Sequence, residues 1–479
     1  MEPNSPILRP GQTCWRIEKA DRLAVIVDAA DYFRTMRDVM QKAQHSVIMI
    51  GWEFDTRIDL DPRREPGDVP DKLGRFLSWL VRQRPDLKIY MLQWDVGLVW
   101  TLGRGSTPLR LADWLIGRRI RLKLDHAHPS GAAHHQKIIV IDDRFAFCGG
   151  IDATADRWDT SEHEDDSPYR VRPTSKRAYD PWHDAALAVD GDAAAALGEL
   201  ARARWKTATG ETLPPPPPVP PLWPDLHPDL TDVSVGISRT APAYGGRDAV
   251  HEIEALYLSI IAAARRTLYI ESQYFASRRM AEAIIARLGE TDGPEIVVIN
   301  PDTAQGWLEE KAMGSARARL LDLVRKADVH DRFRLYTPVT EGRNPIYVHA
   351  KIAIMDDTLL RVGSSNLNNR SMGLDTECDL SIEVTPGQPD EDALRSMIAG
   401  LRRSLVAEHL GVAPDAVDRA LDDAGGSLIA AIEALMGRGR SLVVFEPPEF
   451  AEVTDAALRE NELLDPERPA SRWPSLRKR

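Results

Sequence analysis

The stretch HQKIIVIDDRFAFCGGID, residues 135–152, has a counterpart in HAKIAIMDDTLLRVGSSN, residues 349–366. Both copies fit the pattern H-x-K-x4-D-x6-G, and all four defined residues recur at one constant offset. With 12 histidines and 31 glycines in 479 residues, two such matches by chance are improbable. The repeat therefore predicts an internal duplication, in which each half contributes one copy of the motif.

Outside the motif, each half alternates short apolar stretches with amphipathic ones. This pattern is typical of an α/β fold in which helices cover a buried sheet. We therefore expect two similar halves, each a mixed or mainly parallel sheet flanked by helices, related by a pseudo-twofold axis and sharing one active site. The expected strands are 23–28, 46–54, 88–94, 119–125, 267–275, 295–300 and 332–337, and the expected helices are 32–43, 73–81, one around Leu111, 250–264, 280–288 and 313–326.

Composition shifts along the chain divide these halves. LPPPPPVPPLWP, residues 213–224, is too rich in proline for a helix or central strand and indicates a stiff connector. A surface loop within one domain is the alternative. We predict an N-terminal half over 1–212, a C-terminal half over 225–390, and a helical tail over 391–479 that packs on the second half.

Charge and cysteine content narrow the class of protein. The net charge is -12, which argues against a non-specific nucleic-acid binder but leaves room for a local basic pocket. Three cysteines, far apart in sequence, predict neither a disulfide framework nor a zinc site. Neither a signal peptide nor a transmembrane run of about 18 apolar residues is recognisable. We expect a cytoplasmic monomer, peripheral at most at the inner membrane surface.

The motif itself suggests phosphoryl chemistry. Residues two apart in an extended segment project to one face, so His135 and Lys137 should point together, as should His349 and Lys351. Two lysines can neutralise a phosphodiester without a metal, while one imidazole attacks phosphorus and the other protonates the leaving group. The glycines Gly149 and Gly150, and the pair Gly363–Ser364, are expected to let backbone amides approach the anion.

Five further segments extend the likeness beyond the minimal motif. In these segments the chain resembles the phospholipase D superfamily, and most closely its eukaryotic-type members, whose boxes read GGID with GRWD, IENQYF and IYVHSK. Together they span most of residues 45–385. The segments are GGIDATADRWD (149–159), PWHD (181–184), YIESQYF (269–275), IYVHAK (346–351) and GSSNLNNRSMGLDTE (363–377).

This resemblance implies a role for each residue of the motif. His135 would be the nucleophile and His349 the general acid, later the base. Asp184 and Glu377 would hydrogen-bond the two histidines, with ordinary surface acids as the alternative. The aspartates Asp142 and Asp356 complete the catalytic motif and support the fold around it, and the residues implied to bind phosphate are Lys137, Lys351, Ser364, Asn366, Gly149 and Gly150. Asp152 replaces the asparagine of the minimal pattern and should not touch phosphate.

The expected function is a metal-independent phospholipase D-type phosphodiesterase without a cofactor. It would release the headgroup alcohol from a glycerophospholipid at a membrane surface through a phosphohistidine, or transfer the phosphatidyl group to an alcohol. A cardiolipin-synthase-type phosphatidyltransferase, a nuclease of the same superfamily and an inactive binding module are the alternatives. Two further clusters each have two interpretations. The first is a metal site or a polar loop, formed by His126, His128 and His134. The second is a headgroup pocket or ordinary core packing, formed by Trp52, Trp94, Trp158 and Trp182.

Overall fold

The computed structural model describes residues 5–95, 118–303, 314–447 and Asp465. The helix predicted around Leu111 and much of the chain after residue 447 lie outside these residues. Within the described residues no helix has the length and apolar character needed to cross a bilayer.

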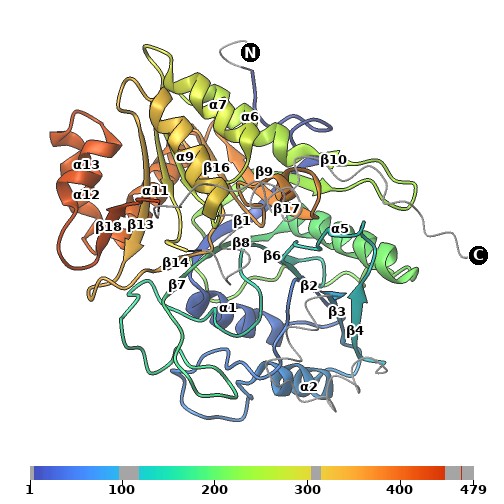
Figure 1. The fold of residues 1–479 in the computed structure, drawn as a ribbon. Coiled ribbons are helices and arrows are strands. Elements are labelled where there is room, and N and C mark those ends of the chain that lie inside the picture. The colour runs from blue at the N-terminus through green and yellow to red at the C-terminus, as the bar shows by residue number, and fades with distance from the viewer. Residues whose placement is uncertain (1–4, 96–117, 304–313, 448–464, 466–479) are drawn as a thin grey trace, which may run out of the picture.

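The two halves repeat one order of main elements (Figure 1). The first half contains β1 (Arg16–Val27), α1 (Ala29–Gln41), β2 (Ser46–Gly51), α2 (Leu73–Gln83), β3 (Lys88–Trp94), β4 (Ile120–Asp125), β5 (Ile138–Ile141), β6 (Phe145–Gly149), β7 (Trp182–His183), β8 (Ala185–Asp190) and α5 (Gly191–Thr209). The second contains β9 (Leu230–Ala241), β10 (Val250–His251), α6 (Glu252–Ala263), β11 (Thr267–Glu271), α7 (Arg278–Leu288), β12 (Glu295–Ile299), α9 (Ser315–Ala327), β13 (Phe333–Val339), β14 (Tyr347–Val348), β15 (Ile352–Met355), β16 (Leu359–Gly363), α10 (Asn369–Gly373) and β17 (Glu377–Glu383). The short elements β7, β10, β14 and α10 interrupt the repeat.

Apart from β7 and β14, which pair with each other, the strands of both halves form one continuous sheet. With β18 (Ser441–Val444) at one edge, its order is β18-β13-β12-β11-β15-β16-β17-β9-β1-β8-β6-β5-β2-β3-β4, so the second half mirrors the first about the antiparallel β9–β1 pair. Parallel pairing joins β2 to β3 and β3 to β4, and likewise β11 to β12 and β12 to β13, while the strands between these sets are antiparallel. The predicted α/β class with two similar halves is therefore confirmed, and the sheet is mixed.

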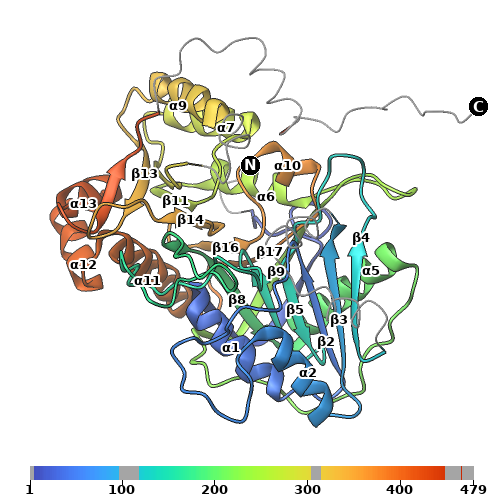
Figure 2. The ribbon, with the colours of Figure 1, turned by 60° about the horizontal axis from the view of Figure 1, so that its bottom comes forward.

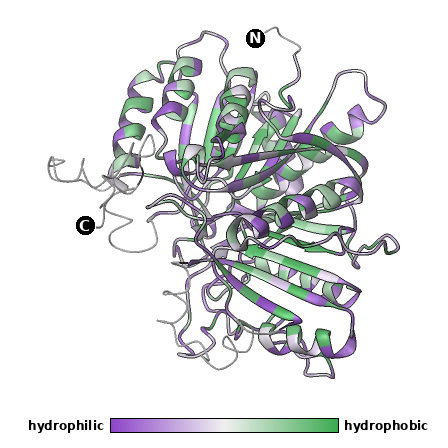
Figure 3. Cartoon of the chain, turned by 90° about the vertical axis from the view of Figure 1, so that its right-hand side faces the viewer, coloured by the Kyte–Doolittle hydropathy of each residue, from purple (hydrophilic) through white to green (hydrophobic). Residues whose placement is uncertain are grey.

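Helices cover both faces of this sheet, as the alternating apolar pattern requires. In the first half, one core layer packs α1 and α2 against β2 and β3 (Figure 2), and the equivalent layer of the second half packs α6 and α7 against β11 and β12. A third layer on the opposite face runs through both halves and includes buried residues of α5 and α11 (Glu391–Leu410). Figure 3 shows apolar residues concentrated along the strands, while the helices mix polar and apolar residues.

The described residues after β17 are mostly helical. They contain α11, α12 (Pro414–Asp423), α13 (Leu428–Leu435) and the short strand β18 (Ser441–Val444), which pairs with β13. Residues 213–224 have no regular secondary structure and lead from α5 towards β9, although Leu213, Val219 and Leu222 are buried.

Candidate active site

The two motif copies occupy equivalent places in the sheet. His135 and Lys137 directly precede β5, and His349 and Lys351 directly precede β15, so each strand begins one residue after its lysine rather than at the histidine. In both copies the lysine Nζ donates a hydrogen bond to the carbonyl of the histidine two residues earlier, at 3.0 Å for Lys137. The lysine and histidine of each copy are therefore held as a unit.

Short parallel pairings bring each histidine to an acid from the other half. His134 bridges Thr376, which places His135 beside Glu377, and Val348 of β14 pairs with His183 of β7, which places His349 near Asp184. His135 Nδ1 lies 2.9 Å from Glu377 Oε2. His349 Nδ1 lies 2.6 Å from Asp184 Oδ2. Because each carboxylate occupies Nδ1, the Nε2 of both rings is left for substrate.

Two serines fix the Glu377 carboxylate. Ser364 Oγ donates to Oε2 at 2.5 Å, and Ser371 Oγ donates to Oε1 at 2.7 Å. The Ser364 hydroxyl is fully buried and also accepts from the Cys378 N–H, so it orients Glu377. The expectation that Ser364 binds phosphate is therefore wrong, because its hydrogen bonds are made within the protein.

Burial and mutual charge shift the pKa of the central groups. The side chains of Lys351, Asp184 and Glu377 are almost fully excluded from solvent, whereas His135 keeps 12% of its surface. Burial and then the lysine charges lower the pKa of both histidines well below the ordinary value, and lysines of both halves act on each histidine. Burial also lowers the pKa of Lys351 to about 7. It raises the pKa of Asp184 and of Glu377 to about 7.

The residue three places after the motif glycine differs between the copies. Asp152 Oδ2 lies 3.1 Å from Lys137 Nζ, and its other oxygen accepts the Trp52 N–H at 2.9 Å. Asn366, the counterpart of Asp152, is buried and its Oδ1 has no hydrogen-bond partner among the described residues. Lys137 is therefore paired with a carboxylate, whereas the second copy presents an amide that retains hydrogen-bonding capacity.

The glycines serve close packing rather than anion binding. The Gly149 N–H donates to the Lys137 carbonyl and the Gly150 N–H to the Ala185 carbonyl, so neither amide is available to a phosphate. A Cβ on Gly150 would lie 2.1 Å from Asp184 Oδ1. The expected role of Gly149 and Gly150 in phosphate binding is therefore wrong, and Gly150 instead lets Asp184 approach the site.

The motif aspartates lie at the far end of their strands. Asp142 accepts three backbone N–H groups that lead into β2, and Asp356 accepts three that lead into β11. Each follows its four-residue strand, so β5 or β15 separates it from the histidine. We therefore correct the assignment of both aspartates to the catalytic set, because they tether neighbouring strands and make no contact with the histidines.

Aromatic rings flank both histidines. The ring centroids of Trp52 and His135 are 5.3 Å apart, and those of Trp182 and His349 are 5.1 Å apart. The Arg157 guanidinium carbon lies 4.1 Å from the Trp182 ring centre, and its charge contributes to the low pKa of His349. Trp52 and Trp182 thus contact the catalytic groups, and Trp94 packs on Trp52 with ring centroids 4.2 Å apart.

Comparisons with known proteins agree with this geometry. A family model described as "Cardiolipin synthase, PLD-like domain" matches residues 257–390, which include the second motif. Phospholipase D A of Dictyostelium discoideum is 24% identical over 83% of this chain. Phospholipase D alpha 1 of Oryza sativa subsp. japonica is 24% identical over 80% of it. The chain is similar to the phospholipase D superfamily.

The matches cover only part of the curated relatives. The chain spans 36% of the Dictyostelium relative and 64% of the rice one. A solved phosphatidylserine synthase of Haemophilus influenzae superposes with a TM-score of 0.53, covering 88% of this chain and 95% of that one at 12% identity. This last likeness supports the phospholipase D-like fold alone.

A buried cluster of histidines and carboxylates borders the superfamily motif on the Asp184 side. Single ligand atoms of Asp28, His163, His183 and Glu408 all lie within 4.8 Å of one another. The outer nitrogen of each histidine is held by a further carboxylate, His163 by Asp159 at 2.9 Å and His183 by Glu271 at 2.8 Å. Histidines oriented in this way could hold a divalent cation, whose charge would offset the buried carboxylates.

This cluster was missed by sequence reasoning, as were Ser371, Thr376 and Arg157. Its four members are spread from residue 28 to residue 408 and share no spacing pattern. His183 stands inside the PWHD segment and was the one available signal. The three histidines considered as an alternative metal site lie outside this cluster. His126 and His128 contact Asp95, and the fully buried His134 contacts Thr376.

Proposed function

We propose that this chain is a phosphodiesterase that converts a glycerophospholipid to phosphatidate and the free headgroup alcohol. The observation that carries the proposal is the crossed pairing of His135 with Glu377 and of His349 with Asp184, beside two buried lysines. This arrangement supplies two equivalent imidazoles with free Nε2 atoms and a cationic cradle for one phosphodiester. The names of the Dictyostelium and rice relatives, both phospholipases D, support the same class of reaction.

In the proposed reaction His135 Nε2 attacks phosphorus and the headgroup oxygen leaves. His349, in its cationic form, gives its Nε2 proton to that oxygen. In the free site the pKa of His349 is low. The negative charge of the bound phosphodiester raises this pKa, so the ring holds the proton that it donates. In the second step neutral His349 takes a proton from water, the hydroxide attacks phosphorus, and the P–N bond to His135 breaks.

The carboxylates and lysines act around these two atoms. Glu377 accepts a hydrogen bond from Nδ1–H of His135 and balances the positive charge of the phosphorylated ring, as Asp184 does for protonated His349. Lys137, Lys351 and Asn366 are proposed to hold the phosphoryl oxygens. No step in this scheme passes through a metal ion.

Transfer to an alcohol is the second candidate. The matching family model carries the description of a cardiolipin synthase, and an alcohol could replace water in the second step. A nuclease of the same superfamily is disfavoured by the net charge of -12. We also propose that the chain works as a monomer on a membrane surface. A reducing, cytoplasmic compartment is proposed as well, and the three buried cysteines, all free thiols, support that compartment.

The decisive experiment is a trap of the covalent intermediate. A phosphodiester with a p-nitrophenolate leaving group needs little acid catalysis, so His349→Ala should accumulate phosphohistidine while His135→Ala forms none. The exposed His330→Ala variant serves as the control and should turn over like the wild type. Accumulation in His135→Ala would reverse the two roles.

A second experiment identifies the acceptor and the leaving group. Vesicles of single phospholipids, incubated with the wild type and a graded amount of glycerol, are analysed by mass spectrometry. Phosphatidate as the main product supports hydrolysis, and phosphatidylglycerol as the main product at low glycerol would favour the transferase. Cleavage of single-stranded DNA at a matching rate, with no lipid product, would contradict both.

A further inference from the structure

The buried cluster beside Asp184 joins distant parts of the chain. Its members are Asp28, His163, His183 and Glu408, and we call them the His183 cluster. Asp28 lies between β1 and α1, His163 lies in the connection between β6 and β7, His183 ends β7, and Glu408 belongs to α11. The cluster therefore links the first half to the helical tail.

The spacing of its ligand atoms is close to that of a tetrahedral metal site. His183 Nδ1 lies 2.9 Å from Glu408 Oε1 and 3.3 Å from Asp28 Oδ1. His163 Nε2 lies 3.3 Å from Glu408 Oε1 and 3.7 Å from Asp28 Oδ2. Zinc bonds of roughly 2.0–2.2 Å to nitrogen and oxygen place the ligands of a tetrahedral ion about 3.3–3.6 Å apart. These four atoms are thus already near the corners that an ion requires.

Two of the ligand atoms make no hydrogen bond within the described residues. They are His183 Nδ1 and Asp28 Oδ2, whose side chains are 0% and 1% exposed. The approach of His183 Nδ1 to Glu408 is therefore a short contact without hydrogen-bond geometry. Buried polar atoms without a partner are destabilising, and an ion placed among the four ligand atoms would satisfy both of these.

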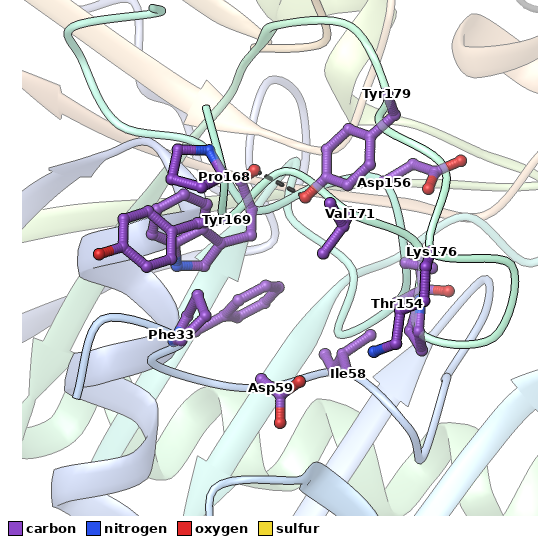
Figure 4. A pocket seen from close by; sticks show the side chains of 14 residues that line it. Phe33, Ile58, Asp59, Thr154, Asp156, Pro168, Tyr169, Val171, Lys176 and Tyr179 are labelled. Atoms are coloured by element: carbon purple, nitrogen blue, oxygen red, sulfur yellow. Dashed lines mark hydrogen bonds between the residues drawn. The ribbon is translucent and has the colours of Figure 1, made fainter. Parts of the chain in front are cut away.

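Asp159 fixes the orientation of His163. Its carboxylate accepts a hydrogen bond from His163 Nδ1 at 2.9 Å and pairs with Arg170 at 3.1 Å. The same connection between β6 and β7 is held at the pocket shown in Figure 4, where the Tyr179 hydroxyl donates to the Trp158 carbonyl at 2.8 Å. None of the four cluster residues lines that pocket, so it is a separate space. His163 Nε2 is left for the cluster, as is usual for a metal-binding histidine whose other nitrogen is held by a carboxylate.

Glu271 fixes the orientation of His183 in the same way. It accepts hydrogen bonds from His183 Nε2 at 2.8 Å, from His409 Nε2 at 3.0 Å and from the Tyr269 hydroxyl at 2.5 Å. These three donors occupy the Glu271 carboxylate, so it orients His183 and does not bind an ion itself. A neutral His183 ring that donates from Nε2 presents a lone pair at Nδ1, which is the form that binds a metal.

The charges around the histidines favour a divalent cation. Four carboxylates contact the two rings, namely Asp28, Asp159, Glu271 and Glu408. Among the described residues, Arg170 is the one arginine or lysine that pairs with any of them. Two protonated histidines would supply the same charge as a divalent ion, but only the ion would also occupy His183 Nδ1 and Asp28 Oδ2.

We propose that the His183 cluster binds one Zn²⁺ ion through His163 Nε2, His183 Nδ1 and one oxygen each of Asp28 and Glu408. Two imidazoles suit Zn²⁺ better than Mg²⁺ or Ca²⁺, which prefer oxygen ligands. Four protein ligands close the coordination sphere, as in structural zinc sites. The proton between His163 Nε2 and Glu408 is released to solvent when the ion binds. Glu408, whose side chain is 11% exposed, marks the route of entry.

The ion would fix the backbone that carries Asp184. The Asp28 carboxylate accepts the Asp184 N–H at 3.2 Å, the Asp28 N–H donates to the Asp184 carbonyl at 2.7 Å, and His183 directly precedes Asp184 in the chain. None of the four ligands belongs to the proposed catalytic set. The site is therefore structural, and the phosphoryl transfer proceeds without the ion.

The zinc content and zinc affinity of the full chain test the proposal. For protein produced in zinc-supplemented medium and purified by gel filtration, elemental analysis should find about one zinc ion per chain. Competition with a chromophoric chelator gives the affinity. Loss of a ligand in His163→Ala or Glu408→Gln should weaken it by more than about 100-fold, and Glu271→Gln, which disturbs only the orientation of His183, by about 10-fold to 100-fold. Glu408→Gln keeps the shape of a partly exposed side chain, so it serves as the test if His163→Ala does not fold, as judged by circular dichroism.

The matched control is His126→Ala, which removes an exposed histidine that contacts Asp95 outside the cluster and should bind zinc like the wild type. Substitution by Co²⁺ should give the strong visible absorption of a tetrahedral ion, and this absorption should be absent in Glu408→Gln. A folded wild type that retains no zinc, zinc lost in His126→Ala but kept in Glu408→Gln, or a preference for Mg²⁺ or Ca²⁺ would overturn the proposal. Because the readout is metal content, a failure here is distinguishable from a failure of the proposed phosphodiesterase reaction.

Discussion

Asp184 lies 2.6 Å from Nδ1 of His349, although the two residues come from different halves of the chain. Glu377 and His135 make the reverse connection at 2.9 Å. For neither motif histidine, therefore, does the carboxylate at Nδ1 come from the same half of the chain. The active site therefore forms only when the two halves pack together.

Removing either carboxylate should reduce turnover without abolishing substrate binding. We expect Glu377→Gln and Asp184→Asn to lower kcat by about 10² to 10⁴-fold, because an uncharged amide cannot stabilise a cationic imidazole. Steady-state kinetics on a soluble phosphodiester measures the effect. If Asp184 serves His349 as acid, a p-nitrophenolate leaving group should partly rescue the first step in Asp184→Asn but not in Glu377→Gln. Equal rescue in both variants would contradict the unequal roles.

The dependence of kcat/KM on pH should be bell-shaped with its maximum near pH 7. The pKa of Asp184 and of Glu377 is raised to about 7, so both carboxylates gain protons as pH falls below that value. The pKa of Lys351 is lowered to about 7, so this cation is lost as pH rises above it. Lys351→Arg should move the alkaline limb upward, since a guanidinium stays charged. A wild-type profile flat from pH 7 to 9 would argue against this role of Lys351.

The motif aspartates should matter for stability rather than for chemistry. Asp142→Ala would leave three backbone N–H groups before β2 without their acceptor, at a cost of about 3 kcal/mol in the free energy of unfolding. Chemical denaturation gives this change, and kcat of the folded fraction should stay within about threefold of the wild type. Asp356→Ala is the matched variant of the second half. A loss of kcat with unchanged stability would return these residues to the catalytic set.

An exchange of residues between the two motif copies should shift anion affinity in opposite directions. Asp152→Asn removes the carboxylate 3.1 Å from Lys137 Nζ and should tighten competitive inhibition by inorganic phosphate about fivefold to tenfold. Asn366→Asp places an acid at the equivalent position of the second copy and should weaken it. Inhibition constants measured side by side give the comparison. The same direction of change in both variants would show that Asp152 does not modulate Lys137.

Much of the fold could be predicted because local patterns are strong in its buried strands. The limits of β3, residues 88–94, were predicted as observed, and β11, β12 and β13 lie within a few residues of their predicted ranges. Helix α5 was missed because its alanine-rich sequence lacks a marked apolar period. Strand β18 was missed because four residues acquire strand character only by pairing with β13.

Site residues could be predicted where they belong to one recognisable sequence segment. Their hydrogen-bond partners could not, because tertiary packing determines them. The histidines, lysines and two acids were found from the motif and its resemblances. The short parallel pairings at Thr376 and His183 determine which acid binds which histidine. The spacing of residues in the sequence does not reveal these pairings. The glycine and Ser364 errors have a related origin, because the partner of a backbone or hydroxyl group is set by neighbouring strands.

The backbone pairing of β1 with β9 has a mechanical consequence. These central strands are joined over the register from Arg16↔Ile237 to Leu23↔Leu230, and each is also paired on its other side. A clamshell rotation of one half against the other would have to break the hydrogen bonds between β1 and β9, so the two halves cannot open about a hinge. A lipid must therefore enter, and its product leave, by the movement of side chains and loops over a frame that stays rigid.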